Sequence, residues 1–219
     1  MLNWNIYLVM DLKGHGNRTA YDIAAEAIEG GIEVLQIRDK ELPADQFILR
    51  AKPIQKLCKE KGVTFIINDY LDIALELNAD GLHVGQDDLA GNEARKILSN
   101  GKIIGISASS IEEAKIALDN GADYLGVGAI YPTSTKEDAG QAVTPALIQE
   151  IRKMTAIPIV GIGGIGHGNA GPVIAAGGNA VAVVSAVCQS ENPTIATKRL
   201  KEEVLQAKET NVIYRELEG

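Results

Sequence analysis

Eight short apolar runs, separated by longer amphipathic stretches, constrain the fold of this 219-residue chain more than any other feature. The runs are rich in Ile, Val and Leu and are continuously apolar, which is typical of parallel strands covered on both faces. We predict strands at residues 6–10, 34–37, 64–67, 81–84, 103–106, 124–127, 159–162 and 180–184. Helical patterns follow the strands, for example at residues 21–29, 44–60, 111–120 and 144–154. This alternation predicts βα units around a parallel sheet.

Eight successive βα units in a chain of this length predict one α/β domain, residues 1–219, folded as a (β/α)8 TIM barrel. An open doubly wound sheet is the alternative, but it rarely needs eight successive units. Before every second strand the helix ends in a glycine-containing connection, and glycine there is the expected left-handed end of a helix. These connections are residues 30–31, 78–81, 120–123 and 177–179.

Composition and charge narrow the class of protein. No apolar run approaches the roughly 18 residues of a membrane span, and the N-terminus lacks the basic start and apolar core of a signal peptide. A net charge of −8 argues against a nucleic-acid partner, although a few local cations can still bind a small anion. Cys58 and Cys188 are far apart and outside any metal-ligand spacing, so we interpret them as reduced thiols of a cytoplasmic protein. A homo-oligomer is an open alternative, because no sequence feature fixes an interface.

The segment after the second predicted strand carries an amide and two cations. Gln36, Arg38 and Lys40 occupy alternate positions and therefore share one side of an extended chain. A surface ion-pair cluster with the neighbouring carboxylates is one interpretation. A guanidinium and an ammonium at the mouth of a barrel strand favour a diphosphate site.

Carboxylates follow the third and fourth predicted strands. Two of them, Asp69 and Asp88, come from neighbouring strand ends and can share one Mg²⁺, which takes one or two protein carboxylates together with waters and phosphate oxygens. Asp87 is better explained as a helix N-cap or turn residue. His83 lies inside a strand, where a hydrogen-bonded interior histidine is at least as good an interpretation as a catalytic one.

The loops after the fifth, seventh and eighth strands are small and polar. Ser107 follows the fifth strand, and no histidine stands beside it in the sequence to support a hydrolase triad. Paired glycines at 163–164 and Ser185 follow the seventh and eighth strands, where barrels often bind phosphate through backbone N–H groups.

The loop after the sixth strand contains Thr133, Ser134, Thr135 and Lys136, three hydroxyls and an ammonium in four residues. These groups suit a phosphorylated ligand, while a solvated turn is the alternative. The cations and the predicted metal gather at one part of the rim and suit a diphosphate, whereas the neutral glycine and serine nest suits a monophosphate. Two such anion sites predict two phosphorylated substrates, one of which loses diphosphate.

In order and spacing, these runs resemble the thiamine-phosphate synthase family. The resemblance reaches from the second strand to Ser185 and rests on residues 36–40, 67–69, 83–89, 126–136, 161–165 and 184–186. It implies a transferase of thiamine biosynthesis that condenses 4-amino-2-methyl-5-(diphosphomethyl)pyrimidine with 4-methyl-5-(2-phosphoethyl)thiazole, or its carboxylated form. The products are thiamine phosphate and diphosphate. In this family the diphosphate is thought to leave first, with help from Mg²⁺, and the thiazole nitrogen captures the resulting pyrimidine-methyl cation.

The resemblance also implies which residues form the site. The pyrimidine diphosphate would be held by Gln36, Ile37, Arg38, Asp39, Lys40, Asn68, Ser107 and Lys136. The thiazole phosphate would be held by Thr133, Ser134, Thr135, Gly164, Val184 and Ser185. One Mg²⁺ per subunit would be bound by Asp69 and Asp88. The residues expected to act on the reacting groups are Arg38, Lys40, Ser107 and Lys136, with loop 132–139 closing over them to exclude water.

The sequence departs from the family pattern at two positions, with Tyr70 in place of a common arginine and Ala129 in place of a common proline. A thiazole tautomerase-like isomerase is the nearest alternative. Its pattern lacks the second metal aspartate and has a histidine near Ser107, whereas this chain has Asp88 and no such histidine. A non-catalytic phosphate-binding barrel is the third interpretation, and it has no need of a metal-bound leaving group.

Overall fold

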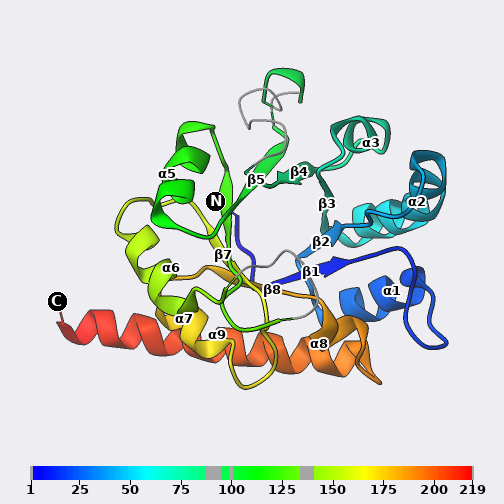
Figure 1. Ribbon diagram of the computed structural model, residues 1–219. Helices are drawn as coiled ribbons and strands as arrows, with labels where there is room; N and C mark the ends of the chain where they lie inside the picture. The colour runs from blue at the N-terminus through cyan, green and yellow to red at the C-terminus, as the bar shows by residue number, and fades with distance from the viewer. Residues whose placement is uncertain (1, 87–94, 99–100, 134–140, 219) are drawn as a thin grey trace.

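The computed structural model describes residues 2–86, 95–98, 101–133 and 141–218. Within them, eight parallel strands form a closed barrel in chain order, with β8 hydrogen-bonded to β1 (Figure 1). The strands are β1 (Ile6–Met10), β2 (Val34–Ile37), β3 (Thr64–Asn68), β4 (Gly81–Val84), β5 (Ile103–Ala108), β6 (Tyr124–Val127), β7 (Ile159–Ile162) and β8 (Ala180–Val183). The predicted α/β barrel is therefore confirmed.

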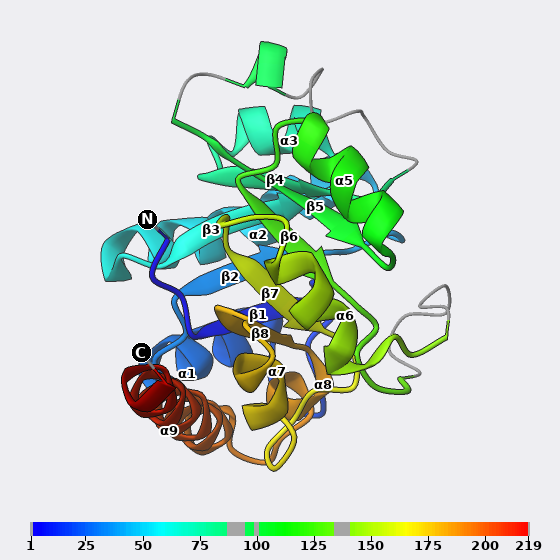
Figure 2. The same ribbon diagram turned by 90° about the vertical axis from the view of Figure 1, so that its left-hand side faces the viewer.

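Helices surround the barrel (Figure 1). They are α1 (Ala20–Gly30), α2 (Ala44–Lys61), α3 (Leu71–Glu76), α5 (Ile111–Asp119), α6 (Thr144–Arg152), α7 (Gly171–Ala175), α8 (Ser185–Cys188) and α9 (Pro193–Glu218). The long α9 packs against α1, α7 and α8, as the side view in Figure 2 illustrates for α1 and α7. In the described part of the chain, no helix is long and apolar enough to cross a membrane.

Three strand ends differ from the prediction. β3 extends to Asn68, β5 extends to Ala108, and β8 ends one residue early at Val183. Parallel pairing continues through Asn68, opposite His83, and through Ser107, opposite Gly126. Both polar residues are therefore held by the barrel ladder itself rather than by a loop.

Most of the predicted glycine helix ends are confirmed. Gly31, Gly121 and Gly177 have φ angles of 99°, 76° and 102°. The prediction is wrong for the 78–81 connection, where Asn78 takes the left-handed conformation at φ 47°. Gly81 instead lies in β4, where a Cβ atom would stand 2.3 Å from the carbonyl oxygen of Ile103, so the glycine there allows close strand packing.

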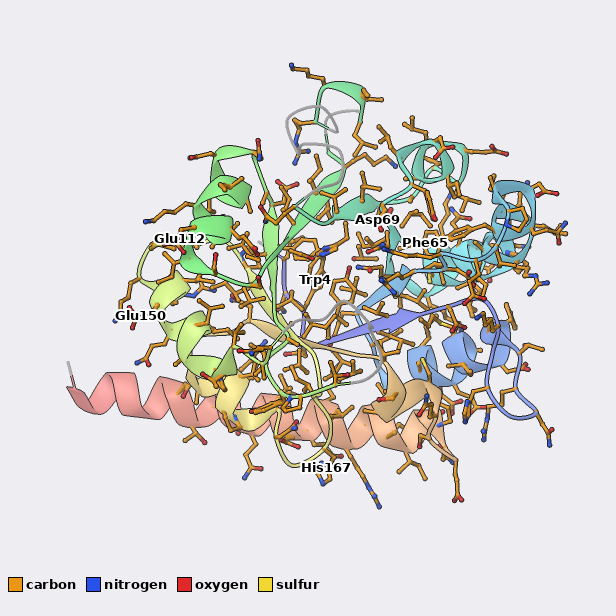
Figure 3. The ribbon with its side chains drawn as sticks, in the orientation of Figure 1. Trp4, Phe65, Asp69, Glu112, Glu150 and His167 are labelled. Atoms are coloured by element: carbon orange, nitrogen blue, oxygen red, sulfur yellow. The ribbon has the colours of Figure 1, made fainter. Side chains whose placement is uncertain are left out.

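The barrel interior contains a second apolar cluster, separate from the core between strands and helices. Its members are Trp4, Tyr7, Val9, Val34, Ile66, Tyr124, Val160, Ala180 and Ala182. Trp4, which Figure 3 shows near the middle of the ring, packs edge-on against Tyr7 and Tyr124 with ring centroids 5.8 and 5.2 Å away. Since Trp4 precedes β1, this aromatic group fills the amino-terminal part of the barrel.

The interior has no room for an added methyl group at Gly105. A Cβ atom there would lie 2.1–2.3 Å from the ring of Tyr124, which is fully buried and cannot move aside. We expect Gly105→Ala to lower the free energy of unfolding by about 1–3 kcal/mol, measured by denaturant titration. Gly166→Ala is the control, because its Cβ would meet only Ala186 at an ordinary 3.7 Å. Equal stabilities of the two variants would contradict this packing.

Candidate active site

The carboxyl ends of β2 and β3 bring a cation and a carboxylate together. The Nζ atom of Lys40 lies 4.0 Å from Oδ2 of Asp69, and the two side chains are 53% and 18% exposed. Asp69, labelled in Figure 3, has a left-handed backbone (φ 62°), and its N–H donates to the carbonyl oxygen of His83 at 2.8 Å. This main-chain hydrogen bond to the neighbouring strand end fixes the position of the Asp69 backbone, from which the carboxylate projects.

The predicted metal site is described only in part. Asp69 supplies a half-buried carboxylate at the barrel mouth, and a carboxylate oxygen is the ligand type that Mg²⁺ prefers. Asp88 lies outside the described residues. Within those residues, no group of three or more His, Cys, Asp or Glu could hold a metal ion. Because Mg²⁺ usually takes only one or two protein carboxylates, Asp69 fits such a site as one of its ligands.

Two residues of the predicted 36–40 site use their side chains elsewhere. Ile37 is fully buried in the core between strands and helices. The Asp39 carboxylate is 3% exposed and accepts hydrogen bonds from the N–H groups of Leu12, Glu41 and Leu42 at 3.0–3.2 Å. Asp39 therefore ties the β1–α1 loop to the β2–α2 loop, and ligand contacts from these two positions, which stay a prediction, would come from the main chain.

A continuous chain of side chains crosses the barrel interior. Gln36 Nε2 donates to Tyr7 Oη at 2.6 Å, and Tyr7 Oη lies 2.8 Å from Tyr124 Oη. Tyr124 Oη lies 2.9 Å from His83 Nδ1, and His83 Nε2 lies 2.9 Å from Ser107 Oγ. We call these five residues the interior chain. It confirms that His83 is a hydrogen-bonded interior histidine. It also connects Gln36 of β2 with Ser107 of β5, two residues predicted to bind the pyrimidine substrate.

The two phenols of the interior chain remain neutral. Burial raises the pKa of Tyr7 and of Tyr124 well above the ordinary value, and the two rings also pack on Trp4. Sequence reasoning missed both tyrosines. Alternate side chains of a barrel strand point into the interior, and each tyrosine stands at such a position. Phenols in otherwise apolar strands are the signal from which a polar partner inside the barrel could have been inferred.

The loops after β6 and β7 lie against each other at the predicted phosphate nest. Gly163 and Gly164 have φ angles of 97° and 64°. A Cβ atom on Gly164 would lie 2.7 Å from the carbonyl oxygen of Pro132, and Tyr131 N–H donates to the carbonyl oxygen of Gly163 at 3.0 Å. Thr133 follows directly, so the nest and the start of the hydroxyl-rich loop are neighbours. Ser134, Thr135 and Lys136 lie outside the described residues.

A cavity of about 420 Å³ lies between the β1–α1 loop and α8. Its lining includes Val184 and Ser185, the remaining predicted thiazole-phosphate residues, together with Asp11, His15 and Cys188. Burial raises the pKa of the Cys188 thiol to about 12, so this free cysteine stays protonated and is no nucleophile at neutral pH. Cys58 is also a free thiol, and both cysteines are therefore unpaired as predicted.

A carboxylate from α9 organises the β7–α7 loop. Glu203 accepts hydrogen bonds from the N–H groups of Gly168, Ala170 and Gly171 at 2.7, 2.8 and 3.0 Å. His167, at the bottom of Figure 3, places Nδ1 3.1 Å from the same carboxylate. Nothing in the sequence around Glu203 distinguishes it from the many other acidic residues of its helix, so sequence reasoning missed it.

Asn169 links that loop to the glycine nest. Its side chain donates to the carbonyl oxygen of Gly164 at 2.9 Å and accepts from the N–H of Gly166 at 2.8 Å. Its own carbonyl oxygen accepts from Tyr131 Oη at 2.9 Å. The loops after β6 and β7 are thus held in one position by α9, Asn169 and Tyr131.

The fold and the site define a (β/α)8 barrel whose mouth carries the Lys40–Asp69 pair and a glycine nest. A family model described as thiamine monophosphate synthase matches residues 6–187. The chain belongs to this family of enzymes. Curated relatives include the thiamine-phosphate synthase of Moorella thermoacetica, 45% identical over 95% of this chain and 99% of the relative. That of Bacillus cereus is 47% identical over 91% of this chain and 92% of the relative.

A solved structure agrees with this assignment, and a second shows the same fold. Thiamine phosphate pyrophosphorylase from Pyrococcus furiosus superposes with a TM-score of 0.84 at 34% identity, covering 94% of this chain and 97% of that chain. 3-Hexulose-6-phosphate synthase superposes with a TM-score of 0.70 over 90% of this chain and 99% of that chain, but at 15% identity that likeness shows the fold alone.

Glu203 should make stability depend on pH. Burial alone would raise the pKa of its carboxyl, but the backbone N–H groups of the β7–α7 loop and His167 lower it below the ordinary 4.5. The stabilisation is therefore complete above pH 4.5 and is lost as the pH falls through the lowered pKa. We expect Glu203→Gln to lower the free energy of unfolding by about 1–3 kcal/mol at neutral pH, and by less in acid.

Denaturant titrations of both proteins between neutral and acidic pH check this prediction. Glu202→Gln is the matched control, because Glu202 is the exposed neighbour and makes none of these bonds. A difference between wild type and Glu203→Gln that stays constant down to the most acidic point would contradict the role of the charge.

Proposed function

We propose that this chain condenses 4-amino-2-methyl-5-(diphosphomethyl)pyrimidine with 4-methyl-5-(2-phosphoethyl)thiazole to give thiamine phosphate and diphosphate. The carboxylated form of the thiazole would react in the same way, but with loss of CO2 and uptake of one proton at the carbon that carried the carboxyl group. The observation that carries the proposal is the near full-length likeness to proteins named thiamine-phosphate synthase, such as that of Moorella thermoacetica. The pairing of Lys40 with Asp69 at the barrel mouth supports it, because a diphosphate site needs cationic groups beside a metal ligand.

The diphosphate would lie over the carboxyl ends of β2 and β3. Arg38 and Lys40 would bind its oxygens there, and Lys136 would approach from the β6–α6 loop. The proposal includes one Mg²⁺ per subunit, held by Asp69 and Asp88, which would supply positive charge to the departing diphosphate. Fixed cations act most strongly where negative charge develops as the reaction proceeds, so they favour bond breaking over mere binding.

The bond changes are simple. The carbon–oxygen bond of the pyrimidine methylene breaks, and its electron pair leaves with the diphosphate. The ring and its amino group stabilise the resulting cation, and the lone pair of the thiazole nitrogen forms the new carbon–nitrogen bond. With the uncarboxylated thiazole no proton has to be transferred, which agrees with the engagement of both ring nitrogens of His83 in the interior chain.

The second substrate would be held by its phosphate group. The backbone N–H groups around Gly164 and Ser185, together with the hydroxyls of Thr133, Ser134 and Thr135, suit a monophosphate because they carry no full positive charge. Asn169 and Glu203 would keep this nest in position. The diphosphate and the monophosphate would thereby be directed to different parts of the rim.

Neither alternative function is favoured. A thiazole tautomerase-like isomerase or a non-catalytic barrel would use similar phosphate contacts, but the curated relatives named here are synthases. A cytoplasmic location and the absence of a nucleic-acid partner stay predictions from the sequence, and a homo-oligomer stays an open alternative.

The deciding experiment is an assay with both substrates and Mg²⁺, with and without EDTA. We expect thiamine phosphate and diphosphate to appear in equal amounts, and only when metal is present. Product that forms at the same rate in EDTA would remove the metal from the proposal. Folded protein that forms no product would overturn the synthase.

Asp69→Asn tests the proposed metal ligand. We expect at least about a hundredfold loss of kcat, because an amide keeps the shape of the side chain but not its charge, and a higher Mg²⁺ concentration for half-maximal rate. Asp72→Asn is the control, because it makes the same chemical change at an exposed position of α3, and this variant should keep wild-type rates. An unchanged Mg²⁺ titration of Asp69→Asn would exclude Asp69 as a ligand.

A further inference from the structure

The interior chain connects Gln36 of β2 to Ser107 of β5 through groups that each have few protons to give. The two phenols between these ends are fully buried, and burial raises the pKa of both, so each keeps one proton. Trp4 covers the two rings from the amino-terminal side. A neutral imidazole also carries a single ring proton. The direction of one hydrogen bond therefore determines the direction of the next.

The hydrogen bonds of the interior chain have a defined donor-to-acceptor direction when they are followed from Gln36. The amide N–H of Gln36 donates to Tyr7 Oη, so Tyr7 cannot give its own proton back to that nitrogen. Among the described residues, Tyr124 is the remaining partner of this buried hydroxyl, and a buried donor normally finds an acceptor. Tyr7 must then donate to Tyr124, and Tyr124 must donate to His83 Nδ1.

The same reasoning fixes the two ends that face the barrel mouth. With Nδ1 accepting, the ring proton of His83 is on Nε2 and is donated to Ser107 Oγ. The hydroxyl proton of Ser107 is then free to be donated to a ligand. At the other end, Gln36 directs Nε2 toward Tyr7 Oη, and its Oε1 makes no hydrogen bond within the described part of the protein. The interior chain thus presents a hydrogen-bond donor at Ser107 and a hydrogen-bond acceptor at Gln36.

Reversing the Gln36 amide would reverse every bond. Oε1 would accept from Tyr7, Tyr7 would accept from Tyr124, and the proton of His83 would move to Nδ1. Ser107 would then donate to His83 and offer only a lone pair to a ligand. The two tyrosines couple these end groups, so that Ser107 and Gln36 cannot change roles independently.

We propose that Tyr7 and Tyr124 are positioning residues that set Ser107 as a hydrogen-bond donor and Gln36 as an acceptor, and so select a 4-aminopyrimidine over its 4-oxo analogue. This inference rests on the proposed function. A 4-aminopyrimidine offers a ring nitrogen that accepts, beside an amino group that donates. The 4-oxo analogue has the opposite pattern at these two atoms, with a protonated nitrogen beside an accepting oxygen. The interior chain complements only the first pattern.

The direct test is the protonation of His83 in the folded wild-type protein. The chain contains three histidines, so the ¹⁵N signals of the His83 ring can be assigned by comparison with His15→Gln and His167→Gln variants. We expect the neutral tautomer with the proton on Nε2 as a single species. A proton on Nδ1 in the wild-type protein would overturn the proposed direction, whatever the enzyme does.

The functional test uses Tyr7→Phe and Tyr124→Phe, each of which removes one link and keeps the ring. We expect about a tenfold rise in KM for the amino substrate, the size of one neutral hydrogen bond. We also expect a smaller preference over the 4-oxo diphosphate, a mixture of His83 tautomers, and an unchanged KM for the thiazole phosphate. Tyr21→Phe is the matched control, because Tyr21 is 44% exposed on α1 and should match wild type.

The outcomes separate this inference from the proposed function. A purely structural role would lower the melting temperature of both variants and leave the amino-to-oxo preference and the His83 tautomer unchanged, which would overturn the inference while the synthase activity stands. A wild-type protein that converts neither pyrimidine would overturn the proposed function and this substrate preference together. If one variant does not fold, the other variant and the wild-type tautomer still decide the matter.

Discussion

Closure of the sheet between β1 and β8 is the constraint on which the rest of the structure depends. Ile6, Tyr7 and Leu8 pair with Val181, Ala182 and Val183, so the ends of the strand series meet and no strand edge is left in the sheet. Once the sheet is closed, alternate side chains of all strands must share one narrow interior. The same closure brings every strand's carboxyl end to one rim, which is why residues far apart in the sequence become neighbours there.

The barrel interior consequently contains both a packed apolar core and a chain of hydrogen-bonded polar groups. Near the amino-terminal end it is filled by Trp4 and small or branched side chains, as a packed barrel requires. The phenol hydroxyls of Tyr7 and Tyr124, which belong to the same cluster, form hydrogen bonds with amide and imidazole groups, since a buried polar group without a partner is costly. These bonds run across the barrel rather than along its wall, so opposite parts of the rim are mechanically and electrostatically joined.

Much of this architecture is predictable from the sequence, because buried parallel strands are continuously apolar and their period is local. The strand limits at β1, β2, β4, β6 and β7 are correct to the residue. The extensions to Asn68 and Ala108 were missed because hydrogen bonding to a neighbouring strand, not apolarity, keeps those residues in the ladder. The use of Asp39 as a loop tie and the partnership of Tyr7 with Tyr124 depend on contacts between distant segments, which no local pattern encodes.

The position of Glu203 has a consequence for how the molecule is made. The carboxylate that ties down the β7–α7 loop comes from α9, after all eight strands in chain order. During synthesis, the glycine turn at 163–164 therefore leaves the ribosome about forty residues before its brace, at several residues per second. The barrel wall can begin to assemble in that interval, but the β7–α7 loop receives its three hydrogen bonds from Glu203 only when the last helix docks. The ordering of this part of the rim is thus a late event in the biogenesis of this enzyme.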